Sequence, residues 1–375
     1  MIKTTIKNER LIAHKTECLV IFSTEEKNPS GKLAELDTKL NGIIKSSFKN
    51  KRFQGKLNQT ILLNTKKPMQ AEHLLLVGLG KSIEITADKL RQAAGTAAKF
   101  AEKSNLKTVS FFIPANDPAN YISVALSESN ESFAQTVVEG SLLSLHHFDE
   151  HKQLAKDKLS RLKKITLLTS LKSQVSSLRY SASKGQKITR AVLASRDLIS
   201  QPSNIATPTY LADKAREFAK SFGMTCKVLA TSDMKRLGMG ALLGVAKGSE
   251  EPPVFIVLEH NGGTKNDPPV VIVGKGITFD TGGISLKPPA SMDEMKMDMS
   301  GAAITLGTLS AAAALKIPLN IVGLVPASEN MPSGRAIKPG DILTSMSGKT
   351  IEVLNTDAEG RLILADALTY AAKYK

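Results

Sequence analysis

Short apolar runs alternate with amphipathic segments along the first 170 residues of the chain. Four runs rich in Val, Ile, Leu and Phe predict buried β-strands: 17–23, 60–64, 73–80 and 108–114. Between the last two, the segment TADKLRQAAGTAAKFAEKS (86–104) has apolar residues at helical spacing and many strong helix formers. This alternation predicts an α/β domain that ends with a further apolar run near 163–170.

The second half of the chain repeats the alternation. A helix is predicted over 207–223, because a Thr-Pro pair opens this segment and a glycine ends it. An apolar strand (268–276), a helix of small residues (301–316) and a second buried strand (317–330) follow. We therefore expect a mainly parallel central sheet with helices on both faces, and a functional site at the carboxyl ends of its strands.

These patterns predict two domains and a connector, and 375 residues are too many for one ordinary core. The N-terminal α/β domain covers 1–172 and the C-terminal catalytic α/β domain 201–375. The connector, 173–200, is basic. A polar stretch rich in Ser and Lys (171–187) forms the linker, and a helix (188–200) leads into the second domain.

Charge is distributed unevenly along the chain. Residues 1–200 contain 32 Lys and Arg against 18 Asp and Glu, whereas residues 201–375 contain 18 against 17. The block 151–200 alone has 12 against 2. This distribution argues against a uniformly basic nucleic-acid binder and favours a catalytic domain preceded by a charged connector.

Composition also bears on location. The apolar runs are too short and interrupted to span a membrane, and the first 15 residues lack the apolar core of a secretory signal. Cys18 and Cys226 lie far apart in unrelated contexts, which predicts neither a disulfide framework nor a thiolate zinc site. These features indicate a cytoplasmic protein without a membrane partner.

Charged residues follow the predicted strand 268–276 at its carboxyl end. Lys275 and Asp280 lie where the strand gives way to a glycine-rich loop, Lys287 follows, and Asp298 comes shortly before the small-residue helix. Taken alone, each has an ordinary interpretation as a surface lysine, a loop charge or a helix cap. Together they gather where this architecture builds its sites.

A second charged group opens the apolar segment NTDAEGRLILADALTY (355–370). Asp357 alone could be an N-cap, Glu359 an acid favoured by the helix dipole, and Arg361 a solvated charge. With the two aspartates above, however, this group brings four carboxylates into one region, where they would repel one another unless compensated. Carboxylate ligands without Cys or His suit Zn²⁺, Mn²⁺ or Mg²⁺, and two ions suit this number of ligands.

Three blocks of the sequence resemble the leucyl (cytosol) aminopeptidase family of two-metal exopeptidases: VGKGITFDTGG, MDEMKMDMSGAA and NTDAEGRL. They occur in the family's order and spacing, and NTDAEGRL is similar to its signature. The segment RDLISQPSNIATPTYLA also resembles the family's entry into the catalytic domain, so the resemblance covers roughly 190–375. The N-terminal domain is similar only in its macro-domain-like α/β character and its position. The resemblance implies a metal-dependent aminopeptidase that releases N-terminal residues, preferably Leu, from peptides.

The resemblance also implies five ligands to two divalent ions, Mn²⁺ or Zn²⁺, in each subunit. Asp280 and Glu359 would bridge both ions. Lys275 and Asp298 would bind the tighter ion, and Asp357 the more exchangeable one. A lysine binds a metal only as the neutral amine, so the ions would have to depress its pKa.

Further roles follow from the same resemblance. Lys287 would stay charged and stabilise the tetrahedral diolate, while Arg361 would hold a bicarbonate ion that relays a proton. Met295 matches a residue that lines the pocket for the substrate's first side chain. Family members form homo-hexamers and continue beyond the helix in which this sequence ends. We therefore expect the catalytic domain to be incomplete at its C-terminus and to lack part of the substrate pocket.

Two alternative functions remain open at this point. A DNA-binding regulator or recombination accessory protein is suggested by the basic block 151–200, which includes KDKLSRLKK (156–164). Few aromatic residues and no DNA-reading motif accompany this block, so it supports only weak, non-specific binding. The other alternative is an inactive, truncated paralogue.

Overall fold

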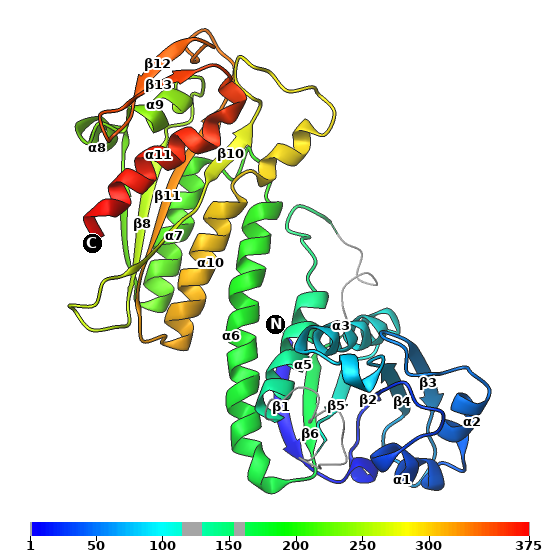
Figure 1. The fold of residues 1–375 in the computed structure, drawn as a ribbon. Coiled ribbons are helices and arrows are strands. Elements are labelled where there is room, and N and C mark those ends of the chain that lie inside the picture. Colours follow the sequence, from blue (N-terminus) through cyan, green and yellow to red (C-terminus); the bar gives the residue numbers. More distant parts are fainter. Residues whose placement is uncertain (1, 115–129, 154–161, 375) are drawn as a thin grey trace. The chain divides into compact units, whose positions relative to one another are not determined.

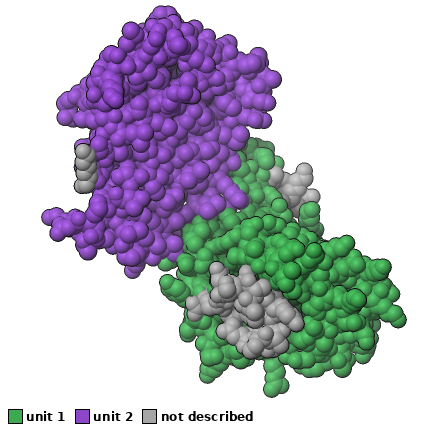
Figure 2. Space-filling model, in the orientation of Figure 1, with its two compact units in different colours: residues 1–189 green, residues 190–375 purple. Residues whose placement is uncertain are grey.

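The computed structural model describes residues 2–114, 130–153 and 162–374. The chain folds into two compact units, Met1–Thr189 and Arg190–Lys375 (Figure 2). Each unit is a β-sheet with helices packed on it (Figure 1). The predicted α/β fold class is therefore confirmed.

The sheet of the first unit is almost entirely parallel. Its strand order is β1-β6-β5-β2-β4-β3, and within it only the β3–β4 pair is antiparallel. The strands are β1 (Lys3–Asn8), β2 (Cys18–Ser23), β3 (Thr60–Asn64), β4 (His73–Gly78), β5 (Thr108–Phe112) and β6 (Lys164–Thr169). Five of the six had been predicted from the apolar runs, and β1, a more polar segment, had not.

Helices cover both faces of this sheet. They are α1 (Gly31–Lys39), α2 (Ile43–Lys49), α3 (Ala87–Lys103), α5 (Asn130–Ser144) and the first part of α6 (Val175–Ser200). On the central strand β2, Val20 and Phe22 pack with α3 and α5, whereas Leu19 and Ile21 pack with α1 and α2. Both faces are buried, which explains why β2 is a continuous apolar run.

A buried histidine links three segments of the first unit. His14 is 2% exposed, with Nδ1 2.7 Å from Glu9 Oε2 and Nε2 2.9 Å from Ser110 Oγ on β5. The hydrogen bond from His14 lowers the pKa of Glu9. The pair joins the segment after β1 to the middle of the sheet.

The polar stretch that we predicted to be a linker is largely helical. Helix α6 runs without interruption from Val175 to Ser200, and the boundary between the two units falls within it. Leu178, Ala182 and Thr189 are buried at helical spacing, a pattern that the Ser- and Lys-rich composition obscured. Part of the basic segment 156–164 lies outside the described residues.

The second unit contains a mixed sheet rather than the mainly parallel sheet that we predicted. Strands β9 and β10 run parallel to β11, whereas β8 runs antiparallel to both β11 and β7. Only residues 262–269 connect β8 to β9, which is too short for the crossover that parallel strands require. The strands are β7 (Thr225–Leu229), β8 (Val254–Asn261), β9 (Val270–Val273), β10 (Gly276–Asp280) and β11 (Asn320–Asn330).

Helices again lie on both faces. Helices α7 and α10 pack on one face of the sheet, and α9 and α11 pack on the other (Figure 1). Helix α7 begins and ends as predicted: the Thr207 hydroxyl accepts a hydrogen bond from Tyr210 N, and Gly223 has a left-handed conformation with φ of 68°. The helices are α7 (Pro208–Phe222), α8 (Thr231–Arg236), α9 (Gly240–Ala246), α10 (Ser300–Leu315) and α11 (Glu359–Ala371).

A small hairpin and several 3₁₀ turns complete the fold. The hairpin pairs β12 (Asp341–Thr344) with β13 (Thr350–Val353). The buried Asp366 of α11 accepts hydrogen bonds from Leu242 N on α9 (2.9 Å) and from Met346 N in the hairpin (2.7 Å). The 3₁₀ turns are η1 (Leu11–Ala13), η2 (Ser82–Glu84), η4 (Lys172–Gln174), η5 (Met292–Met297), η6 (Thr356–Ala358) and η7 (Ala372–Tyr374).

Within the described part of the chain, no helix has the length and apolar character needed to cross a membrane.

Candidate metal centre

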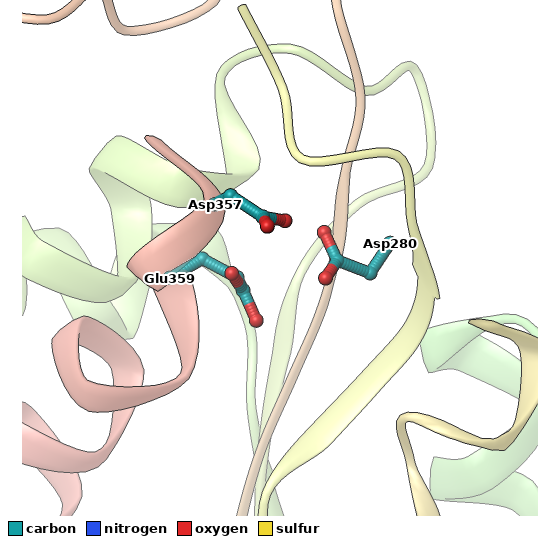
Figure 3. A group of neighbouring side chains, drawn as sticks. All are labelled: Asp280, Asp357 and Glu359. Atoms are coloured by element: carbon teal, nitrogen blue, oxygen red, sulfur yellow. The ribbon is translucent and has the colours of Figure 1, made fainter. Parts of the chain in front are cut away.

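Three carboxylates converge where β10 ends and α11 begins. Asp280 is the last residue of β10, Asp357 lies in η6, and Glu359 is the first residue of α11. One oxygen from each lies within 4.8 Å of the others, and the three side chains point toward one another (Figure 3). The sequence predicted Asp280 where the strand 268–276 gives way to a glycine-rich loop; in the structure it ends a separate short strand, β10.

Lys275 brings the fourth carboxylate to this group. Its Nζ lies 2.7 Å from Asp298 Oδ2 and 2.6 Å from Glu359 Oε1. Lys275 lies between β9 and β10, and Asp298 follows η5. The two carboxylates therefore meet at one ammonium group, although they are 61 positions apart in the chain.

Glycines make room for Lys275. A Cβ at Gly274 would lie 2.3 Å from the Gly301 carbonyl oxygen at the start of α10, and one at Gly360 would lie 2.9 Å from Lys275 Nζ. Neither position can accept a side chain without displacement of its neighbours. The backbone of α10 and the first turn of α11 consequently enclose the lysine closely.

Lys287 pairs with the other two carboxylates. Its Nζ lies 3.0 Å from Asp280 Oδ2 and also forms a hydrogen bond with Asp357 Oδ1. The loop between Asp280 and Lys287 turns at Gly282 and Gly283, whose φ angles of 85° and 68° favour glycine. This turn directs the lysine back toward the end of β10.

The cluster carries more negative than positive charge. Four carboxylates face two ammonium groups. Burial raises the pKa of Glu359 and of Asp298, and the Lys275 ammonium only partly offsets these shifts. Burial would lower the pKa of Lys275 and of Lys287, but the adjacent carboxylates outweigh it and hold both values above the ordinary range. The pKa values of these acids and bases all shift upward, in the direction expected of a site that lacks positive charge.

The donor set fits divalent metal ions. Glu359 Oε2 and Asp298 Oδ2 are buried and have no hydrogen-bond partner among the described residues; Asp298 Oδ2 forms an ion pair with Lys275, so Glu359 Oε2 is the acceptor that remains for a further cation. Buried acceptors are normally paired, and an unpaired one requires an explanation. Carboxylate oxygens, with one lysine nitrogen and no thiolate or imidazole, suit Mn²⁺, Mg²⁺ or Zn²⁺.

The two remaining candidates lie beside the cluster in the chain. Met295 is half-buried in η5, and its carbonyl oxygen accepts a hydrogen bond from Asp298 N (3.2 Å). Arg361 is exposed in the first turn of α11, and its guanidinium forms no ion pair within the described part of the structure. The structure thus gathers six of the seven charged candidates into one cluster and leaves Met295 and Arg361 at the margin.

Sequence reasoning missed a set of polar residues behind the cluster. Asn330 ends β11, and Thr356 opens η6; both are buried. The Thr356 hydroxyl donates to Gly282 O (2.6 Å) and accepts from Ser285 N (2.8 Å), which joins the glycine turn to the segment that carries Asp357. The position of Asn330 at the carboxyl end of a buried strand was a usable signal, because the same reasoning identified Asp280.

An α/β fold with carboxylates and lysines at the strand ends has the features of a metal-binding enzyme. Similarity to known proteins identifies the class of this enzyme. Residues 193–375 match the catalytic domain of the cytosol aminopeptidase family, and residues 19–154 match its N-terminal domain. A probable cytosol aminopeptidase of Geotalea uraniireducens (strain Rf4) is 47% identical over 345 residues, which cover 91% of this chain and 67% of the relative. One of Syntrophotalea carbinolica is 42% identical over 362 residues, which cover 96% of this chain and 71% of the relative.

Solved structures agree with this assignment. A mutant of tomato leucine aminopeptidase superposes with a TM-score of 0.85 at 30% identity, covering 100% of this chain and 72% of that protein. The bottromycin maturation enzyme BotP in complex with Mn superposes with a TM-score of 0.77 at 29% identity, covering 95% of this chain and 69% of that protein. The chain belongs to the cytosol aminopeptidase family, and the predicted resemblance is confirmed. Its class is that of the metal-dependent aminopeptidases.

Proposed function

We propose that this chain is a two-metal aminopeptidase that releases N-terminal residues, preferably Leu, from peptides. The observation that carries the proposal is the convergence of Asp280, Asp357 and Glu359, with a buried Glu359 oxygen that lacks a partner. Lys275 and Asp298 adjoin this group through short contacts. These five residues are those that the family motif assigns to the metal ligands.

Two lysine-centred groups support the proposed division of ligands: Lys275 pairs with Asp298 and Glu359, and Lys287 pairs with Asp280 and Asp357. Asp280 and Glu359 are the most buried of the four carboxylates, and one belongs to each group, with oxygens of the two within 4.8 Å of one another; this supports a bridging role for both. Lys275 and Asp298 would complete one ion site and Asp357 the other. Two dications would balance the four carboxylates, and when bound they would activate a water molecule and polarise the scissile carbonyl.

Lys287 is suited to stabilise negative charge on the attacked carbonyl oxygen. Its side chain is 21% exposed, and its ammonium is held beside Asp280 and Asp357, close to where the substrate would react. The flanking carboxylates hold the pKa of Lys287 above the ordinary range, so the group is charged at neutral pH. A fixed cation that faces developing negative charge contributes to catalysis without reorganisation.

Arg361 and Met295 would complete the site. The guanidinium of Arg361 lies in the first turn of α11, where the helix dipole also favours an anion, and its planar donors match the oxygens of bicarbonate. Met295 lies three residues before Asp298, and its flexible thioether suits an adaptable apolar pocket for the substrate's first side chain.

The choice of metal and the assembly belong to the same proposal. BotP is described in complex with Mn, and this supports Mn²⁺ as the first ion to test, with Zn²⁺ as the second. The relatives' description as cytosol aminopeptidases supports a cytoplasmic location. The homo-hexamer implied by the family resemblance stays a prediction.

Hydrolysis of leucine p-nitroanilide tests the proposal. The full chain is treated with a chelator, dialysed, and assayed before and after addition of Mn²⁺ or Zn²⁺. We expect activity to disappear on chelation and to return with one of the two ions. Hydrolysis that is unaffected by chelation would refute the metal-dependent mechanism, and no hydrolysis under any condition would favour the inactive paralogue.

A further inference from the structure

Asn330 connects the two segments that carry the proposed metal ligands. Its side-chain Nδ2 donates to Asp280 Oδ1 (2.8 Å) and to the Thr356 carbonyl oxygen (3.1 Å). Asn330 is 2% exposed, so water does not compete for these bonds. One amide group therefore joins the end of β10 to the turn that precedes Asp357.

The orientation of this amide is determined by its partners. A carboxylate oxygen and a main-chain carbonyl oxygen only accept hydrogen bonds, so the NH₂ group of Asn330 must face both. The backbone is fixed as well, because the Asn330 carbonyl oxygen accepts from Thr281 N (3.0 Å) and from Thr281 Oγ1 (2.8 Å). A Cβ at Gly283 would lie 2.9 Å from Asn330 Oδ1, so the far side of the amide is closely packed.

These bonds decide which oxygen of Asp280 is available to a cation. Oδ1 accepts from both Gly282 N (2.9 Å) and the Asn330 amide, which occupies its two lone-pair directions. Oδ2 has neither donor and lies 3.0 Å from Lys287 Nζ. Asp280 is therefore held with Oδ2 toward the cluster.

We propose that Asn330 is a positioning residue of the metal centre. It aims Asp280 Oδ2 at the ions and holds the Thr356–Ala358 turn at the distance that Asp357 and Glu359 require. The inference rests on the proposed function, since it assumes that these carboxylates bind metal. Residues that orient metal ligands typically change metal affinity or activity about 10–100-fold when they are removed.

The test measures Mn²⁺ binding to the chelated full chain by isothermal titration calorimetry. Asn330→Ala removes both hydrogen bonds, and Asn330→Ser is a milder variant that leaves a hydroxyl and space for water. Asn320→Ala is the matched control, because Asn320 lies at the other end of β11 and its Nδ2 also bridges two carbonyl oxygens, those of Thr264 (2.7 Å) and Asp267 (3.1 Å). Circular dichroism verifies that each variant is folded.

We expect Asn330→Ala to weaken Mn²⁺ binding by about 10–100-fold, with a smaller loss in Asn330→Ser and wild-type affinity in Asn320→Ala. A merely structural role would lower the thermal midpoint of both alanine variants and leave Mn²⁺ affinity unchanged. Wild-type affinity in folded Asn330→Ala would overturn this proposal alone, and so would failure of both Asn330 variants to fold. A wild-type chain that binds neither Mn²⁺ nor, in a parallel titration, Zn²⁺ would instead refute the proposed function itself.

Discussion

Replacement of Lys287 by alanine separates a catalytic cation from a metal ligand. In the structure Lys287 Nζ lies 3.0 Å from Asp280 Oδ2 and is hydrogen-bonded to Asp357. If Lys287 stabilises the transition state, Lys287→Ala should retain both metal ions and lose turnover. If it is a ligand, the variant should lose metal and keep its rate per bound ion.

The expected loss of rate in Lys287→Ala can be estimated from the contact distances of the ammonium group. An ammonium and an oxyanion at about 3 Å attract each other by roughly 5 kcal/mol at an effective dielectric constant of about 20. The side chain is 21% exposed, and its contacts with Asp280 and Asp357 weaken when it turns to the substrate, so only part of this energy appears in the rate. Loss of one oxyanion donor typically costs about 10²–10³ in kcat, or about 2.7–4 kcal/mol, and we expect a loss in this range.

The assay combines kcat and KM for leucine p-nitroanilide with metal content by mass spectrometry. Lys338→Ala serves as the control, because Lys338 also pairs with an aspartate at 3.0 Å but lies on the surface beside Asp341. This control should keep both rate and metal content. A Lys287→Ala variant that loses metal, or one that keeps wild-type kcat, would refute the role proposed for Lys287.

Three further predictions concern metal content, packing and pH. Asp280→Ala and Glu359→Ala should each bind fewer than two Mn²⁺ per chain and lose metal-dependent hydrolysis, and full occupancy in either variant would contradict a bridging role. Asp366→Ala should lower the unfolding free energy by about 2–5 kcal/mol, because one buried and one partly buried N–H donor lose their acceptor. Urea unfolding measures this change, and an unchanged midpoint would contradict it. Because the pKa of Glu9 is lowered in the folded state, its contribution is present above its unfolded value of about 4.3 and is lost as the pH falls. The difference in thermal midpoint between wild type and Glu9→Gln should therefore shrink as the pH is lowered from about 6 to about 3. A difference that stays constant over this range would show that the contact between Glu9 and His14 does not depend on the charge of Glu9.

Strands that form unbroken apolar runs could be predicted from the sequence. The order and direction of strands in a sheet were harder to predict, because they depend on pairing between distant segments. The runs that became β2, β3, β4 and β5 were found within two residues of their ends. Strand β8 was not predicted, and its antiparallel pairing with β11 is a contact between segments that lie about 60 residues apart in the chain. Helix α6 was partly missed, because serine and lysine mask the helical spacing of its buried positions.

For the site, residue types were predictable and their spatial relations were not. The carboxylates and lysines stand out in sequence because four acids in one region need compensation. Their division into one group around Lys275 and another around Lys287 required the structure. The bonds made by Asn330 to residues 50 and 26 positions away were likewise beyond any local pattern.

The close packing around Lys275 has a consequence for how the site tolerates change. Three glycines lie beside it. An added methyl group at Gly274 would lie 2.3 Å from the Gly301 carbonyl oxygen, one at Gly301 2.7 Å from Lys275 N, and one at Gly360 2.9 Å from the end of the Lys275 side chain. None of the three offers a functional group, yet alanine at Gly274 or Gly301 would collide with backbone atoms, and alanine at Gly360 would displace the end of the lysine side chain. A survey of deleterious mutations would thus be expected to identify these glycines as well as the metal ligands, although the glycines take no part in the chemistry. Engineering of a different ligand at position 275 would have to begin with these glycines.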